Sequence, residues 1–174
     1  MTRFARLRRL APSALALLLL GAPLAFYMVR NGAGLAQAGF TLHAPDWTRL
    51  VGAPAVIQVR LAAALVALAI GVVLLAGVKG TRRHRILGWT WVLAMATTAM
   101  SSFFIHQINP GGLSLIHALS GWTLVGLPMA VYAARRHRVQ AHRRAMTGMF
   151  VGGLVVAGLL TFLPGRLLWA VFFA

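Results

Sequence analysis

The sequence has no cysteine and no glutamate, and Asp46 is its only acidic residue. The absence of cysteine excludes disulfides, thiolate metal sites and a cysteine nucleophile. A single carboxylate cannot form the carboxylate pair of a glycosidase, a di-metal carboxylate site or a proton relay of membrane carboxylates. A Ser-His-acid triad would depend on Asp46, which lies in a predicted outer loop. We therefore assign no enzyme activity from the sequence.

Charge is also scarce: 10% of the 174 residues are charged and 60% are hydrophobic, with a mean hydropathy of +0.81. Soluble domains average roughly 25% charged and 45–50% apolar residues, so a soluble fold would lack polar surface here. The formal net charge of +16 comes from short basic clusters between apolar runs. That placement is typical of a multi-pass membrane protein. It favours the lipid bilayer as the surrounding of the chain and argues against nucleic acid as a partner.

Five apolar runs each approach the ~20 residues that cross a ~30 Å hydrocarbon core. They cover residues 10–29, 55–78, 86–106, 115–134 and 145–163. The sequence therefore predicts an all-α fold, a polytopic transmembrane helix bundle with about five membrane-spanning helices.

The chain divides into three predicted parts. Residues 1–29 hold the basic N-terminus and the first transmembrane helix or signal-anchor, residues 30–54 an outer loop with a short interfacial helix, and residues 55–174 a four-helix membrane bundle with a short interfacial C-terminal tail. The first run together with Ala36-Gln37-Ala38 also resembles a cleavable secretory signal. We favour a retained helix, but cleavage after Ala38 remains open.

The basic residues predict the orientation. Thirteen of the 17 fall on one side of the membrane if the N-terminus is cytoplasmic, as the positive-inside rule requires. We expect a multi-pass protein of the cytoplasmic (inner) membrane with these clusters on the cytoplasmic side. The three clusters are Arg3, Arg6, Arg8, Arg9; Lys79, Arg82, Arg83, Arg85; and Arg135, Arg136, Arg138, Arg143, Arg144.

Two segments between the apolar runs contain motifs that predict local structure. Pro45-Asp46-Trp47 reads as a helix start, with Asp46 as N-cap or as partner of Arg49 and Trp47 as interface anchor. The turn Asn109-Pro110-Gly111-Gly112 is a strong helix breaker that predicts an antiparallel hairpin of the third and fourth helices.

Six histidines are the main chemical resource of the sequence. The predicted topology puts His84, His137 and His142 at the inner face, and His43, His106 and His117 at the outer face. Membrane cytochromes hold haem b between histidines on different helices. Four of the six lie at predicted helix ends, so haem b is a candidate cofactor.

Geometry limits which histidines can cooperate. His84 and His106 are 22 residues apart, about 33 Å along a helix, and cannot share a ligand. His106 and His117 flank a short turn, but adjacent helix axes lie ~8–10 Å apart, which favours a metal ion or a quinone headgroup over haem. Two histidines also fall short of the three or four ligands of zinc.

For haem at the inner face, His84 and His142 on non-sequential helices form the more plausible pair. The competing interpretation is structural, because histidines at helix ends commonly cap carbonyls or lie among lipid headgroups.

Polar side chains form a stripe on each of the two hairpin helices. Thr98, Ser102 and His106 follow at helical spacing on the third. His117, Ser120, Gly121 and Pro128 share a face of the fourth. If the stripes meet, they enclose a polar pocket that opens outward. The alternative is that the hydroxyls only bond neighbouring helices or the backbone.

Small residues and two arginines complete the candidate features. Gly148, Gly152, Gly153 and Ala157 give the fifth helix small-xxx-small spacings, which allow close packing inside the bundle or against a partner protein or a second copy. Arg60 and Arg166 lie near the outer ends of the second and fifth helices. They either snorkel to phosphates or bind a ligand carboxylate or a haem propionate.

Several motifs, in order and spacing, resemble a bacterial family of predicted membrane proteins known as domain of unknown function 2306. They are His84-Arg85-Ile86-Leu87-Gly88, Ser101-Ser102-Phe103, His117, His142-Arg143-Arg144-Ala145-Met146 and Pro164-Gly165-Arg166. The resemblance covers roughly residues 55–170. It implies a topology and candidate positions, among them His84, His117 and His142, but no reaction. His106 is less clearly part of the pattern.

Two functions therefore compete. The first is a redox-linked membrane protein that binds haem b or a quinone through histidines at helix ends. The second is a non-catalytic accessory or assembly subunit of a larger membrane complex. A solute transporter is a weaker third possibility, because the sequence has neither an inverted repeat nor a broken helix.

Overall fold

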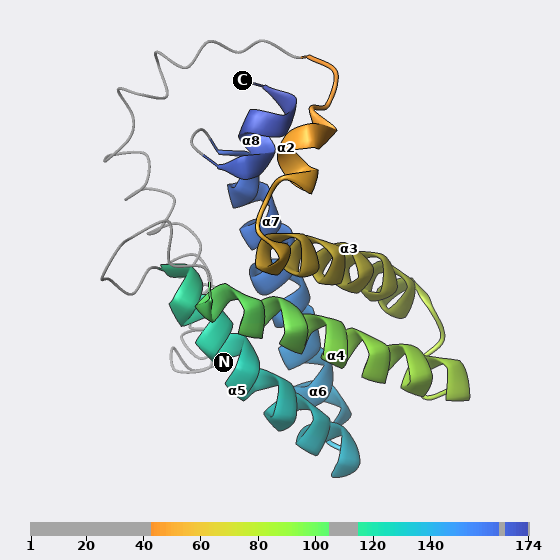
Figure 1. Cartoon of the computed structure of the whole chain (residues 1–174). Helices are drawn as coiled ribbons and strands as arrows, with labels where there is room; N and C mark the ends of the chain where they lie inside the picture. The colour runs from red at the N-terminus through yellow and green to blue at the C-terminus, as the bar shows by residue number, and fades with distance from the viewer. Residues whose placement is uncertain (1–42, 105–114, 164–165, 174) are drawn as a thin grey trace, which may run out of the picture. The chain divides into compact units, whose positions relative to one another are not determined.

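In the computed structural model the apolar runs from residue 55 onward form helices (Figure 1). The structure describes residues 43–104, 115–163 and 166–173. Within these ranges the chain is helical and contains no strand, which confirms the all-α prediction. The elements are α2 (Trp47–Val51), α3 (Ala55–Ala76), α4 (Arg82–Phe103), α5 (Leu115–Arg135), α6 (Val139–Gly148), the π-helix η1 (Met149–Val156), α7 (Ala157–Leu159), the 3₁₀ helix η2 (Leu160–Phe162) and α8 (Leu167–Phe172).

Three helical segments of the described chain are long and apolar enough to cross a membrane. They are Ala55–Ala76, Arg82–Phe103 and Val139–Phe162, the last of which joins α6, η1, α7 and η2. α5 is 21 residues long and contains Pro128. The predicted first helix, the signal-like residues 36–38 and the turn at residues 109–112 lie outside the described residues. A count of five spans therefore stays a prediction.

Two helices begin earlier than the apolar runs predict. α4 starts at Arg82 because the Thr81 hydroxyl caps it, accepting a hydrogen bond of 3.1 Å from the backbone N–H of His84. α6 starts at Val139 instead of residue 145, so its arginines lie on a helix and not in a loop. An apolar run marks only the part of a helix inside the hydrocarbon, and both helices continue into a basic segment beyond it.

The long helices pack as sequential neighbours, α3 on α4, α4 on α5 and α5 on α6, and η1 contacts both α3 and α5. Their shared core holds Ala67, Trp91, Met95, Leu127, Ala130, Met149, Phe150 and Leu154. Gly71 of α3 allows the closest approach. A Cβ added there would lie 2.4 Å from the Phe150 ring and 2.9 Å from the indole nitrogen of Trp91.

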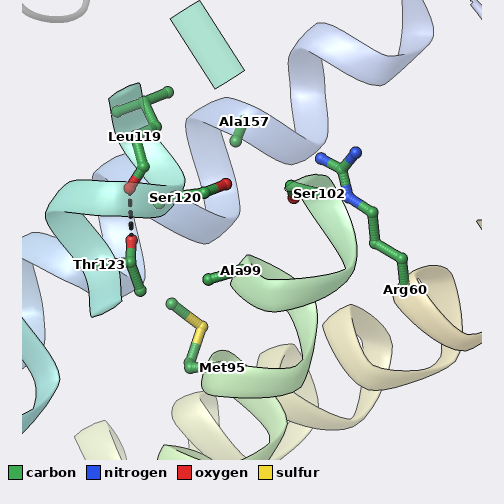
Figure 2. Close-up of a pocket in the computed structure, with 9 residues that line it drawn as sticks. Arg60, Met95, Ala99, Ser102, Leu119, Ser120, Thr123 and Ala157 are labelled. Atoms are coloured by element: carbon green, nitrogen blue, oxygen red, sulfur yellow. Dashed lines mark hydrogen bonds between the residues drawn. The ribbon is translucent and has the colours of Figure 1, made fainter. Parts of the chain in front are cut away.

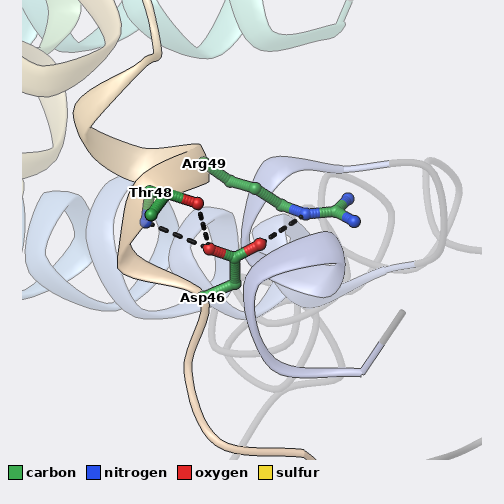
Figure 3. Close-up of polar contacts among 3 residues, drawn as sticks. All are labelled: Asp46, Thr48 and Arg49. Atoms are coloured by element: carbon green, nitrogen blue, oxygen red, sulfur yellow. Dashed lines mark hydrogen bonds and ion pairs between the residues drawn. The ribbon is translucent and has the colours of Figure 1, made fainter.

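The two short helices α2 and α8 lie against each other (Figure 1). The backbone N–H of Asp46 donates to the carbonyl of Val171 at 3.0 Å, and Val171 is buried. The Asp46 carboxylate caps α2 by accepting from the N–H and the hydroxyl of Thr48, and it pairs with Arg49 at 3.0 Å (Figure 3). The predicted helix start and the structural role of Asp46 are both confirmed.

These contacts also set the charge of the only acidic residue. The Thr48 hydroxyl, followed by the Arg49 guanidinium, holds the pKa of Asp46 below its ordinary value. Asp46 is therefore ionised near neutral pH and already has its partners.

Candidate functional site

The polar stripes of α4 and α5 meet inside the bundle, as one of the two interpretations predicted. Ser102 and Ser120 line a pocket of about 30 Å³ together with Arg60 of α3 and Thr123 of α5 (Figure 2). The three hydroxyl residues are buried and Arg60 is half-buried. Pro128, expected on the same stripe, lines a different hollow.

The hydroxyls of this Arg60 pocket are largely bonded to their own helices. Ser102 donates to the carbonyl of Thr98 at 2.9 Å, and Thr123 donates to the carbonyl of Leu119 at 2.8 Å. A cavity needs roughly 10–15 Å³ per water by this measure. The Arg60 pocket therefore has room for a few waters or a small ion, and is too small for a quinone ring or a haem.

Two cations meet near the Arg60 pocket. Arg60 and Arg166 are near enough to repel each other electrostatically. Asp46 is the only acidic residue of the chain and is paired with Arg49. No acidic side chain is left to pair with Arg60 or Arg166, so both can take an anion such as a lipid phosphate.

The structure tests one half of the predicted outer histidine pair. His117 is half-buried on α5 and packs edge-on against Phe103 of α4, with ring centroids 5.8 Å apart. His106 lies outside the described residues. The ring contact gives His117 a packing role.

The other predicted pair, His84 and His142, lies at one end of the bundle. His84 lies in the first turn of α4 and His142 in the first turn of α6, and both are half-buried. The two imidazoles are near enough for charge on one to repel charge on the other. We call this region, defined by His84 and His142, the histidine end of the bundle.

His142 is held by the neighbouring helix. Its Nδ1 lies 2.9 Å from the carbonyl oxygen of Ala130 in α5. Because a carbonyl only accepts hydrogen bonds, Nδ1 carries the proton and Nε2 of the neutral ring keeps its lone pair. A histidine oriented in this way through one nitrogen is the usual form of a metal or haem ligand.

Space is available beside His84. Gly88 follows one helical turn later, and a Cβ built there meets no atom of the described chain within 4 Å. Trp91, seven residues after His84, is buried with its indole N–H unpaired among the described residues. In the described ranges, no three His, Asp or Glu side chains gather as metal ligands. The histidine end therefore offers two nitrogen ligands and an open glycine face.

The histidine end and the Arg60 pocket cannot serve one ligand. Ser102, which lines the pocket, is 18 residues beyond His84 on the same straight helix, a separation of about 27 Å at ~1.5 Å per residue. A haem held by His84 and His142 is therefore out of reach of Arg60 and, by the proximity of the two arginines, of Arg166.

Comparison with known protein families supports the assignment as a membrane protein. A family model described as predicted membrane protein, domain of unknown function 2306, matches residues 57–172. The chain belongs to this family. The match covers α3 to α8, which include both the histidine end and the Arg60 pocket. No curated protein and no solved structure matches the chain.

One hollow was not found by sequence reasoning. α4 and α5 enclose an open groove of about 400 Å³ that includes Trp89, Ala96, Leu124 and Arg135. Pro128 inside α5 was the available signal, because a proline in a helix lacks an N–H and disturbs local packing. The sequence does not show which neighbouring helix borders that position.

Proposed function

We propose that the protein is a redox-linked membrane protein that binds haem b or a quinone at the histidine end, through His84 and His142. The observation that carries the proposal is the approach of these two imidazoles from different helices, with His142 oriented by the Ala130 carbonyl. His84 and His142 would hold a haem, which would supply one-electron transfer. A quinone would accept a hydrogen bond from the His84 imidazole, because the N–H of neutral His142 is already donated to the Ala130 carbonyl.

The proposal includes a topology. We place the protein in a bacterial inner membrane with about five spans and a cytoplasmic N-terminus, so that the histidine end faces the cytoplasm. Lys79 lies near His84, and the arginine clusters of α4 and α6 lie at the same end. The positive-inside rule assigns such an end to the cytoplasm.

Open space supports a ligand at this end. The face of α4 that carries His84 continues into Gly88, where the described chain leaves room for a further group. In the Arg60 pocket, by contrast, the hydroxyls are bonded and the volume is about 30 Å³. The histidine end is therefore the better position for a planar cofactor.

The test is the absorbance spectrum and the quinone content of protein purified from haem-replete cells in mild detergent. We expect either a Soret band with bands that sharpen on reduction, or about one extractable quinone per chain. A colourless preparation without quinone contradicts the proposal.

The alternative is an accessory or assembly subunit of a larger membrane complex. It is supported by Gly158, where a Cβ meets no atom of the described chain within 4 Å, and by the exposed neighbour Leu159. Of the small residues expected at a partner surface, Gly153 packs against Thr123 and Ala157 lines the Arg60 pocket, so both face into the bundle. Gly148 and Gly152 complete the candidate set.

Copurification distinguishes this alternative. Replacing Gly158 with leucine would block close approach of a partner helix, while Gly121→Leu, at an open position of α5, serves as control. A partner at fixed stoichiometry that Gly158→Leu alone releases supports a subunit role. A monodisperse monomer with no partner by mass spectrometry contradicts it.

A further inference from the structure

The groove between α4 and α5 shares no lining residue with the Arg60 pocket and contains neither His84 nor His142. Its volume of about 400 Å³ falls within the roughly 300–1,000 Å³ that is usual for small-molecule sites. Its walls are apolar along most of its length, with Val92 and Ala96 on α4 and Leu124 and Val131 on α5. α4 is long and apolar enough to cross a membrane, so an apolar groove along it can take up a lipid chain.

One end of the groove differs from the rest. Trp89, Tyr132 and Arg135 line it there, and all three side chains are exposed. Tryptophan and tyrosine favour the depth of lipid headgroups. The groove therefore has apolar walls along most of its length. At one end it has aromatic side chains, followed by the positive charge of Arg135.

No acidic side chain is available to pair with Arg135. Asp46 is the only acidic residue and it pairs with Arg49 near α2. The neighbouring Arg136 is occupied by Tyr132, with its Nε 3.1 Å from the phenol oxygen and its guanidinium 5.3 Å from the ring centroid. The guanidinium of Arg135 is therefore available to an anion from outside the protein.

We propose that this groove binds an anionic phospholipid, with the phosphate on Arg135 and an acyl chain along Val92, Ala96 and Leu124. The guanidinium offers paired N–H donors that match a phosphate. The aromatic residues lie between the phosphate and the acyl chain, at the depth of the glycerol. A prenyl quinone would fill the apolar length but has no charge to match Arg135, so the phospholipid is the better occupant.

The experiment measures lipid retention. The full chain is assembled in nanodiscs of phosphatidylcholine with phosphatidylglycerol, extracted in mild detergent and examined by native mass spectrometry. We expect one phosphatidylglycerol per chain, retained in preference to phosphatidylcholine. Arg135→Gln should lower retention about fivefold, the effect of one arginine near the surface. Arg138→Gln, which removes a neighbouring charge outside the groove, should leave retention unchanged.

A second pair of variants tests the apolar length without changing charge. Val131→Phe fills the groove and should reduce retention of phosphatidylglycerol as strongly as Arg135→Gln. Val125→Phe makes the same change at an exposed position of α5 outside the groove and should have no effect. The proposal is overturned if Arg138→Gln reduces retention equally, if Val131→Phe changes nothing, or if Val131→Phe releases a quinone in place of the lipid. None of these outcomes depends on a cofactor at the histidine end.

Discussion

Polar residues have different roles in the Arg60 pocket and at the histidine end of the bundle. At the Arg60 pocket, hydroxyls of α4 and α5 bond carbonyls one turn back in their own helices, and little volume remains. At the histidine end, His142 is held by a carbonyl of another helix and keeps one ring nitrogen for a ligand. Polar residues in a membrane helix thus indicate a binding site only where their hydrogen-bonding capacity is not already used.

The largest expected effect is at Gly88, where a side chain would occupy the space that we assign to the cofactor. Gly88→Leu should remove most of the bound haem or quinone while the helix still forms, because leucine is a good helix former. Gly121→Leu, at an equally open position of α5, is the matched control. Cofactor content per chain is the measurement, and equal content in both variants would remove Gly88 from the site.

Gly71→Ala tests the packing that holds both ends in place. The added Cβ would collide with the buried rings of Phe150 and Trp91, which should lower the free energy of unfolding by about 1–3 kcal/mol. Gly121→Ala meets no neighbour and should be neutral or more stable by about 0.5–1 kcal/mol. Thermal unfolding in detergent measures both. Equal stability of the two variants would mean that α3 does not approach η1 as closely as described.

Arg60→Met separates the two ends directly. It removes the cation of the Arg60 pocket but keeps the length of the side chain. We expect no change of cofactor content and no loss of stability beyond about 1 kcal/mol, because an arginine inside a membrane helix is itself costly. Loss of the cofactor in Arg60→Met at unchanged stability would show that the two ends share one ligand, and the comparison between them would fail.

The smallest effect is expected at Asp46, outside the long helices. Its pKa is lowered by Thr48 and Arg49, so its stabilisation of α2 is present above the ordinary carboxyl pKa and is lost as the pH falls through the lowered one. Amide hydrogen exchange of α2 should be faster in Asp46→Ala than in wild type at neutral pH. Asp46→Asn, which caps without a charge, should be intermediate, and wild type should reach the level of Asp46→Asn at very low pH, because a protonated carboxyl still accepts a hydrogen bond. A difference between wild type and Asp46→Asn that persists at very low pH would contradict this role of the charge.

The sequence predicted the features that depend on one helix at a time. Apolar runs located α3 and α5 within two residues at each end, and the Pro45-Asp46-Trp47 signal located the start of α2. The basic clusters also placed His84 and His142 at one face, but a shared ligand of the two histidines stays a prediction. These inferences need only helix length, capping and charge.

Features that depend on how side chains of different helices meet were missed. Three such features each join residues far apart in the sequence. They are the close approach at Gly71, the groove lined at one end by Trp89 and Tyr132, and the hydrogen bond from Asp46 to Val171. The π-helix Met149–Val156 was also missed, since glycine spacing alone predicts an ordinary packing face. The meeting of Ser102 with Ser120 was foreseen only as one of two interpretations.

The central claim is that His84 and His142 together hold a redox cofactor. Its most direct test is the reduced-minus-oxidised spectrum and quinone content of His142→Ala, compared with wild type and with His137→Asn. His137 is exposed at a φ of 55°, which asparagine tolerates. The account predicts a cofactor signal in wild type and His137→Asn and its loss in His142→Ala. A signal that survives in His142→Ala, or that is absent from wild type, would contradict it.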